Sequence, residues 1–266
     1  MKISLIVPVY NAGSYIGAFL ESVTAQTLDG IKVILVDDRG SDDSINIARK
    51  YIREHPSEKE FIILDAGTNR GPGGARNLGI EKAAGEYLVF ADSDDLLEPE
   101  YCEALYTAAK KHDADIVCCD ARYGDKILSN RAVHTGILEK KSRKKTLAGF
   151  VTYLWTYAFR REFILENGIR FPLQRSAEDS CFVTCSWLSA RSSAYIERPL
   201  YRYIPRDTSV SRVKDRARWK NRINSFCKVK EYAKEKNIYR QYRCAIDRLC
   251  FKKGTLLAIK DYLTNL

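Results

Sequence analysis

The strongest constraint on the fold of this chain is the alternation of short apolar runs with helical patterns across residues 1–120. The apolar runs predict strands at Ile3–Val9, Lys32–Val36, Phe61–Leu64, Glu86–Ala91 and Asp115–Cys119. Helical spacing of apolar residues predicts helices that follow Ser14, begin at Ser44, end near Ala83 and span Pro99–His112. Alternating strands and helices build one sheet covered on both faces. We therefore expect an α/β fold with a doubly wound, mostly parallel sheet.

Acidic residues follow the fourth predicted strand directly, in the sequence Asp92-Ser93-Asp94-Asp95. Ligands of open α/β sheets bind beyond the carboxyl ends of the strands, which is where this tetrapeptide is expected. Three carboxylates within four residues repel one another unless a cation lies among them, and such oxygen ligands suit Mg²⁺ or Mn²⁺. The alternative is a polar turn whose aspartate caps the next helix.

Two further motifs follow the second and third predicted strands. Asp38 ends the second strand, where its carboxylate can accept hydrogen bonds from a ribose or a nucleobase. After the third strand we expect a glycine-rich loop at Gly71–Gly74, whose N–H groups can approach a ligand, with Arg76 in reach of a base or a phosphate. A helix cap at Asp38 and a plain turn at the glycines are the structural alternatives.

A fourth acidic motif, Glu178-Asp179, lies far along the chain at the predicted start of a helix that runs to Leu188. A carboxylate there can act as a general base on an acceptor hydroxyl. It can also simply stabilise the helix, because negative charge is favourable at a helix N-terminus. We expect a short strand at Ser193–Ile196 after this helix.

Together these motifs resemble glycosyltransferase family 2, the inverting transferases with a GT-A fold. The resemblance extends over about residues 1–210 and rests on segments in a fixed order: Ser4–Asn11, Val36–Asp38, Asn69–Asn77, Phe90–Asp95, Glu178-Asp179, Tyr201–Tyr203 and Ser209–Ser211. The family usually has glycine directly after its Asp-Asp pair, whereas this chain has Arg39. That departure leaves the nucleotide of the donor open.

The resemblance implies that a sugar is transferred from a nucleotide-diphospho-sugar, with UDP the expected nucleotide, to an acceptor hydroxyl with inversion. The reaction would serve cell-surface polysaccharide or glycolipid synthesis. It implies Asp94 and Asp92 as ligands of a divalent cation, Mn²⁺ or Mg²⁺, and Asp179 with Glu178 as the catalytic pair. It assigns donor binding to Pro8, Tyr10, Asn11, Asp38, Asn69, Gly71, Arg76, Asp92 and Ser93. Acceptor contacts are expected from residues 122–173, which begin with a polar surface excursion at 122–145, and from the C-terminal part.

The C-terminal part of the chain is basic. The whole chain carries a formal charge of +10, while residues 212–253 hold fifteen Lys and Arg against four Asp and Glu, a net of +11. We predict a GT-A domain over residues 1–211 and a basic helical segment over 212–266, with two helical stretches separated near Asn237. Such charge suits an anionic membrane surface, where a lipid-linked glycan acceptor would lie. A solvated helical face is the alternative.

Cysteine usage and apolar runs bear on location. The eight cysteines lack metal-type spacing and predict reduced, buried thiols. No run reaches the roughly 18–20 apolar residues that cross a bilayer, and the first residues lack the features of a secretory signal. We expect a cytoplasmic location with peripheral contact to the inner face of the cell membrane.

Two other functions compete with this interpretation. A nucleotidyltransferase would share the sheet, metal and nucleotide, but it would release pyrophosphate instead of a nucleoside diphosphate. A nucleic-acid-binding protein would use the basic segment, but it leaves Asp92–Asp95 unexplained, and the sequence holds no recognised nucleic-acid motif. No nucleic-acid partner is expected, and the sequence leaves the oligomeric state open.

Overall fold

The computed structural model describes residues 1–174, 176–206 and 218–264 of the chain. In chain order its elements are β1 (Ile3–Val9), α1 (Ile16–Thr24), β2 (Ile31–Asp37), α2 (Ser44–Glu54), β3 (Glu60–Asp65), α3 (Gly71–Lys82), β4 (Tyr87–Phe90), β5 (Leu96–Leu97), α4 (Tyr101–Lys111), β6 (Ile116–Tyr123), β7 (Lys126–Leu128), β8 (Gly136–Ile137), α5 (Lys140–Gly149), the 3₁₀-helix η1 (Leu154–Thr156), β9 (Tyr157–Arg160), α6 (Arg161–Glu166), α7 (Glu178–Ser189), β10 (Ser192–Tyr203), α8 (Arg218–Glu235), α9 (Tyr239–Leu249), the π-helix η2 (Cys250–Leu256) and α10 (Leu257–Thr264). All five predicted strands are present, as β1, β2, β3, β4 and β6.

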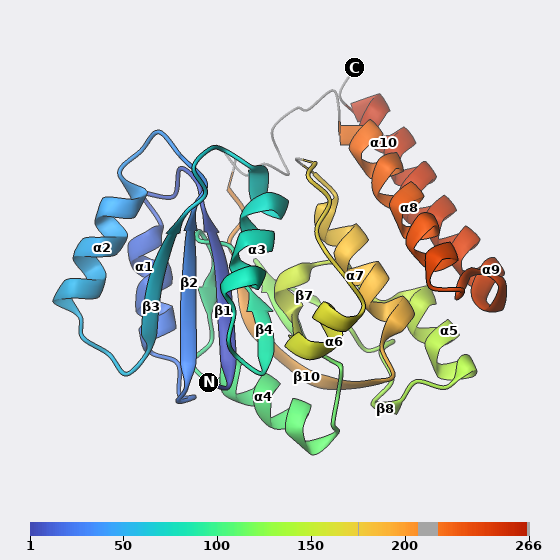
Figure 1. Ribbon diagram of the computed structural model, residues 1–266, viewed down its shortest axis with the longest axis horizontal. Helices are drawn as coiled ribbons and strands as arrows, with labels where there is room; N and C mark the ends of the chain where they lie inside the picture. The colour runs from blue at the N-terminus through green and yellow to red at the C-terminus, as the bar shows by residue number, and fades with distance from the viewer. Residues whose placement is uncertain (175, 207–217, 265–266) are drawn as a thin grey trace.

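The strands form one ten-stranded sheet in the order β3-β2-β1-β4-β9-β6-β10-β5, with β7 beside β6 and β8 beside β10. The first four strands run parallel, as predicted. β1 shows why no polar–apolar alternation marks these strands: nearly all its residues are buried, because helices cover both faces. Figure 1 shows β1, β2 and β3 side by side in one half of the molecule.

β9 interrupts the parallel order. It lies antiparallel between β4 and β6, in a stretch for which the sequence predicts no strand. Its four residues are too few to show a period, and both its faces are buried: Tyr157 and Phe159 enter one core and Ala158 the other. The sheet is therefore mixed, with a parallel half that ends at β4 and a half of both directions from β9 to β5.

Two apolar cores lie on the opposite faces of the sheet. One contains Phe19 of α1 and Leu105 of α4, and the other contains Ile80 of α3 and Phe182 of α7. The neighbouring residues Cys118 and Cys119 of β6 point into different cores, because successive side chains of a strand alternate. Helices thus cover both faces, which the doubly wound prediction requires.

The C-terminal helices pack on the outer side of α7, at the opposite end of the molecule from α2 (Figure 1). Phe226 and Val229 of α8 belong to the same apolar core as Phe182 of α7. The two predicted helical stretches are α8 and α9, and Asn237 between them takes a left-handed φ of 57°. The predicted domain boundary at 211/212 and the motif Ser209–Ser211 lie outside the described residues.

One expectation about local structure is wrong and two need refinement. Gly71–Gly74 is not a loop but the first turn of α3, where Pro72 has the fixed φ that a helix start favours. The strand expected at Ser193–Ile196 is present but longer, as the twelve-residue β10, because pairing with β6 continues past irregularities around Pro199. The stretch 122–145 is mostly exposed, as expected, but it also carries β7, β8 and the start of α5, and its Asn130 is fully buried.

All eight cysteines lie in the described part of the chain and are free. Six are buried, as predicted, whereas Cys227 and Cys244 are exposed on the C-terminal helices. Within the described ranges, no helix combines the length and the apolar character that spanning a membrane requires.

Candidate active site

The ends of β1, β2 and β4 bring the first two acidic motifs to one edge of the sheet. Val9 pairs with Asp37 and Ile6 with Phe90, so the residues that follow these strands leave the sheet on the same side. Asp38 is 2% exposed, and its Oδ1 accepts a hydrogen bond from the backbone N–H of Arg70 at 2.7 Å. This carboxylate thus links the end of β2 to the start of α3.

The loops after β1 and β2 are fixed to each other. Asn11, at a φ of 50°, accepts the Ser41 N–H on its Oδ1 at 2.8 Å. Gly40 has no room for a side chain, since a Cβ there would lie 2.7 Å from the Asn11 nitrogen. Arg39 adopts a φ of 58°, a conformation that glycine favours, and its guanidinium pairs with Asp65. The turn therefore keeps its left-handed geometry without the usual glycine.

The other donor-binding candidates differ in accessibility. Tyr10 is 50% exposed, whereas Pro8 is half-buried within β1 and Ser93 is 6% exposed. The exposed Asn69 accepts the Gly71 N–H on its side-chain oxygen at 3.2 Å, and Gly71 has a left-handed φ of 71°. Tyr10 and Asn69 are thus the candidates of this group most open to a ligand.

Arg76 of α3 joins the acidic motifs. It is 4% exposed, and its guanidinium donates to Asp92 at 2.8 Å, Glu178 at 2.9 Å and Asp179 at 2.8 Å. Burial alone would lower the pKa of Arg76, but the three carboxylates outweigh burial and raise it above its usual range. The terminal nitrogens of this side chain bind protein carboxylates, and its contact with a base or a phosphate stays a prediction.

Asp92 and Asp94 keep part of their carboxylates in solvent. Their side chains are 32% and 35% exposed, and Arg206 pairs with Asp94 at 2.7 Å. Burial, followed by the negative charge of Asp92, raises the pKa of Asp94. A cation beside these two carboxylates would offset the repulsion between their negative charges.

Asp95 has a different role in the same turn. It is 1% exposed, and it accepts hydrogen bonds from the Tyr201 hydroxyl and the Ile204 N–H, both at 2.8 Å. The Tyr201 hydroxyl also accepts the Asp92 N–H at 3.1 Å. Burial, followed by the negative charge of Asp92, raises the pKa of Asp95 to about 8. Asp95 therefore anchors the turn to the end of β10.

Asp179 lies in the first turn of α7. Its surroundings disfavour the charged form of its carboxylate. Burial raises its pKa well above the usual range; Arg76 partly offsets this, while Glu178 and Asp92 add to it. The side chain is still 28% exposed, so an acceptor can reach it. The residue at the cap position is Ala177, and no side chain there caps the helix.

Ala177 takes a left-handed φ of 61°, which is uncommon for a residue with a Cβ and costs about 1 kcal/mol or more. Its carbonyl accepts a hydrogen bond from the buried hydroxyl of Ser225 on α8 at 2.7 Å. The C-terminal helices therefore support the backbone from which Asp179 projects.

Two residues of this site were missed by sequence reasoning: Arg206 and Ser225. Tyr201 lies in the family segment Tyr201–Tyr203, but nothing in the sequence pairs it with Asp95. Arg206 and Ser225 carry no signal, because an arginine after a strand and a serine on a helix are ordinary.

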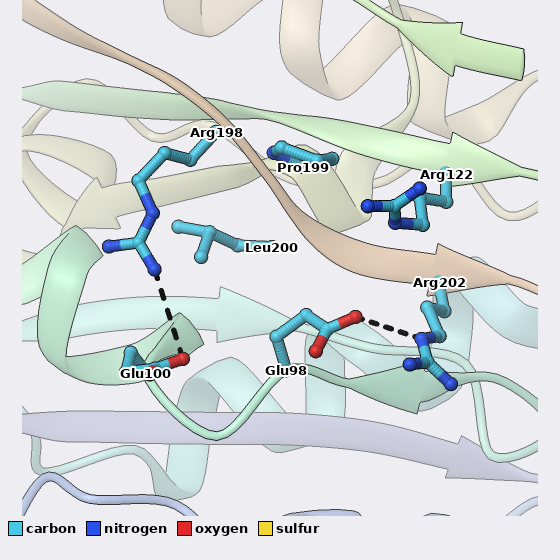
Figure 2. A pocket seen from close by; sticks show the side chains of 7 residues that line it. All are labelled: Glu98, Glu100, Arg122, Arg198, Pro199, Leu200 and Arg202. Carbon is cyan, nitrogen blue, oxygen red and sulfur yellow. Dashed lines mark hydrogen bonds and ion pairs between the residues drawn. The ribbon is translucent and has the colours of Figure 1, made fainter.

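A pocket of about 480 Å³ lies apart from these acids, lined by Glu98, Glu100, Arg122, Arg198, Pro199, Leu200 and Arg202. Figure 2 shows its two ion pairs, Glu98 with Arg202 at 2.8 Å and Glu100 with Arg198 at 3.9 Å. None of the predicted site residues lines this pocket, and most of its charges are paired internally. The acids around Arg76 therefore remain the candidate active site.

Comparison with known proteins decides the family. Residues 4–170 match the family described as Glycosyl transferase family 2. The chain belongs to glycosyltransferase family 2. It is 30% identical over 273 residues to the putative glycosyltransferase EpsH of Bacillus subtilis, covering 99% of this chain and 78% of that protein. Of four further curated relatives, the chain spans only 32% to 64% of the length.

Solved structures show the fold. TarS 1–349 of Staphylococcus aureus, in complex with UDP-GlcNAc, superposes with a TM-score of 0.71 at 22% identity, over 100% of this chain and 80% of that chain. TarS is named a poly(ribitol-phosphate) β-N-acetylglucosaminyltransferase. The mannosyltransferase PcManGT of Pyrobaculum calidifontis, in complex with GDP-Man and Mn²⁺, superposes with a TM-score of 0.64 at 20% identity, over 99% and 72%. The GT-A fold expected from the sequence is confirmed.

Proposed function

We propose that this glycosyltransferase moves a sugar from a UDP-sugar to a hydroxyl of a polysaccharide or glycolipid acceptor, with inversion at the anomeric carbon. The observation that carries the proposal is the Arg76 cluster. It brings Asp92 and the Glu178-Asp179 pair together at the edge of the sheet that also holds Asp38. TarS, which binds UDP-GlcNAc, supports UDP as the nucleotide, and no relative named above is a nucleotidyltransferase or a nucleic-acid-binding protein.

A divalent cation, Mn²⁺ or Mg²⁺, fits the turn after β4. Asp92 and Asp94 would hold it, because both carboxylates are partly exposed, and burial followed by the charge of Asp92 raises the pKa of Asp94. Within the described ranges no three acidic, histidine or cysteine side chains form a metal group by themselves, so phosphate oxygens of the donor would complete the shell. When bound, such a cation supplies charge neutralisation for the departing diphosphate.

Side chains of the protein would bind the nucleotide and remove the proton of the acceptor hydroxyl. Asp38, fixed by the Arg70 N–H, would bind the ribose or base, with Asn11 and Tyr10 on the adjoining loop. Asp179 would take the proton of the acceptor hydroxyl as that oxygen attacks the anomeric carbon from the side opposite the diphosphate. Arg76 would hold the Asp179 carboxylate in place by the hydrogen bond at 2.8 Å.

The test is a calorimetric titration with UDP, with and without Mn²⁺, on the wild type, Asp94→Ala and a control, Asp29→Ala. Asp29 is an exposed residue before β2, at the edge of the sheet away from the acids. We expect metal-dependent binding that is lost in Asp94→Ala and kept in Asp29→Ala. Metal-independent binding would refute the cation site. No binding of UDP would refute the nucleotide, and GDP and dTDP would then be titrated.

We also propose that the C-terminal helices hold the protein on the inner face of an anionic membrane. The described residues 218–264 carry thirteen Lys and Arg against four Asp and Glu, a net of +9. Beside these charges lie exposed large apolar side chains, namely Phe251, Leu256, Leu257, Ile259, Tyr262 and Leu263. Basic charge with apolar side chains is the combination that binds anionic lipid interfaces.

Vesicle sedimentation tests this location. We expect binding to phosphatidylcholine vesicles that contain phosphatidylglycerol, weakening as salt is raised. Ile259→Asp, at a residue 51% exposed on α10, should reduce binding, whereas Ile137→Asp, at a residue 75% exposed on β8, should not. Equal loss in both variants, or no binding at low salt, would refute membrane contact through these helices.

A further inference from the structure

Aromatic rings from three segments form a continuous stack beside the acidic turn. Tyr123 and Tyr203 stack at 5.0 Å between centroids with 7° between their planes, and Tyr203 stacks on Trp155 at 5.8 Å and 17°. Trp155 also stacks on Tyr201 at 4.6 Å and on Tyr153 at 5.1 Å. The nearly parallel planes make this a layered platform, unlike the edge-to-face packing that dominates the rest of the core.

The stack is fixed to the proposed reaction centre through Tyr201. The hydroxyl of this residue donates to Asp95 at 2.8 Å and accepts the Asp92 N–H at 3.1 Å. The same tyrosine that orients the acidic turn therefore forms one layer of the aromatic stack.

Exposure changes sharply along the stack. Tyr201 is fully buried and Trp155 is 5% exposed, whereas Tyr153 is 44% exposed. Its neighbour Trp155 covers one face of the Tyr153 ring, so the exposed part of the ring is open to a ligand.

The backbone that carries Tyr153 is held in place by buried polar groups. The Tyr153 carbonyl accepts the Thr156 N–H at 3.1 Å, and the Val151 carbonyl accepts the Tyr157 hydroxyl at 2.6 Å. Asn130, fully buried, accepts the Val151 N–H on its side-chain oxygen at 3.3 Å and donates to the Thr156 hydroxyl at 3.2 Å. A ring held this way loses little conformational freedom when a ligand binds.

The stack lies away from the proposed nucleobase site. Asp38, the proposed nucleotide ligand, follows β2, while Tyr123 and Tyr203 lie on β6 and β10. In the sheet, β6 is four strand spacings from β2, or about 19 Å at about 4.8 Å per spacing. A nucleobase held at Asp38 therefore does not extend to Tyr123 or Tyr203. Tyr153, at the exposed end of the stack, belongs to the stretch 122–173 from which we expect acceptor contacts.

We propose that Tyr153, backed by Trp155, is the platform on which a pyranose ring of the acceptor stacks. A sugar ring presents a face of C–H groups that carries partial positive charge and matches the negative face of an aromatic ring. Its hydroxyls point outward at the rim, where they keep their water. The inference rests on the proposed function and adds the residue that holds the acceptor sugar.

The experiment measures binding of methyl β-glycosides of glucose, galactose and N-acetylglucosamine by saturation-transfer NMR, with UDP and Mn²⁺ present. Wild type, Tyr153→Ala, Tyr153→Phe and Tyr51→Ala are compared. Tyr51 is the matched control, since it is a partly exposed tyrosine that also stacks on a neighbouring ring, His55, but lies on α2. We expect a glycoside that binds wild type to bind Tyr153→Ala roughly three- to tenfold more weakly, a loss typical of one aromatic contact. Tyr153→Phe and Tyr51→Ala should match wild type.

Titration with UDP separates this inference from the proposed function. All four proteins should bind UDP with equal affinity. A wild type that binds no nucleotide would refute the proposed function itself. With UDP binding intact, the platform is refuted if no glycoside binds wild type, or if Tyr153→Ala binds the glycosides as wild type does. A loss of the same size in Tyr51→Ala would refute it as well.

Discussion

At the scale of single residues, the geometry of the candidate site depends on the guanidinium of Arg76, and its proposed chemistry depends on the carboxylate of Asp179. Arg76 is 4% exposed and pairs with Asp92, Glu178 and Asp179. Arg76→Ala leaves three acids without their cation, and we expect it to lower the free energy of unfolding by about 3–5 kcal/mol in urea denaturation. Arg39→Ala is the control, because its pair with Asp65 is about half exposed and screened by water, so the stability should stay near the wild-type value. Equal losses would show that burial does not set the strength of the Arg76 contacts.

Asp179 belongs to the same scale. We expect Asp179→Asn to lower kcat by about 10²–10⁴-fold while UDP binding stays near the wild-type value. A base must be ionised to accept a proton, and the pKa of Asp179 is raised chiefly by burial. Activity should therefore fall as the pH drops through that raised pKa, at a higher pH than for an ordinary aspartate. A pH profile of kcat whose acid limb lies near pH 4, or near-normal turnover of Asp179→Asn, would remove this residue from the role.

At the scale of elements, helix α3 places Arg76 by packing closely on β1. A Cβ at Gly79 would lie 2.3 Å from Cγ2 of Ile6, whereas a Cβ at Gly17 on α1 would meet nothing within 4 Å. We expect Gly79→Ala to destabilise the protein by about 1–3 kcal/mol and to lower activity, since it pushes α3 off the sheet. Gly17→Ala should be neutral or stabilising by up to about 1 kcal/mol. Thermal unfolding of both variants checks this, and a stabilising Gly79→Ala would contradict the close packing.

Helix α3 is also tied to the segment that leads to α7. The Asn77 side chain accepts the Phe171 N–H at 3.0 Å and donates to the Phe171 carbonyl at 2.9 Å. A Cβ at Gly73 would lie 2.7 Å from the Pro172 carbonyl oxygen. Gly73 and Asn77 thus help to set the distance between α3, which carries Arg76, and the segment that leads to Asp179.

At the scale of the whole molecule, the predicted division at residue 211 is a hypothesis about folding. Phe226 and Val229 of α8 share a core with α7, and Ser225 supports Ala177 beside the proposed catalytic pair. We expect calorimetry to show one cooperative transition with equal calorimetric and van't Hoff enthalpies. Phe226→Ala should lower the free energy of unfolding of the whole protein by about 3–5 kcal/mol. Two separate transitions would instead show that the basic helices fold on their own.

The fold class and the acidic motifs could be predicted from the amino-acid sequence alone. The apolar runs predicted five strands because a buried parallel strand needs apolar residues on both faces, and those runs depend only on local sequence. Asp92, Asp94 and Asp38 could be recognised for the same reason, since each follows such a run. β9 could not be predicted, because its four residues form a strand only by pairing with β4 and β6.

Only the tertiary structure decided how the motifs work together. Nothing in the sequence distinguishes Asp94 from Asp95. In the structure Asp95 is 1% exposed and hydrogen-bonded to Tyr201, whereas Asp94 keeps part of its carboxylate in solvent. Likewise, nothing local shows that Arg76 bridges Asp92 and Asp179, or that Tyr153 ends an aromatic stack. The physical reason is that strand and helix patterns arise from neighbours along the chain. The charge state of an acid and the openness of a ring depend on residues that only folding brings near.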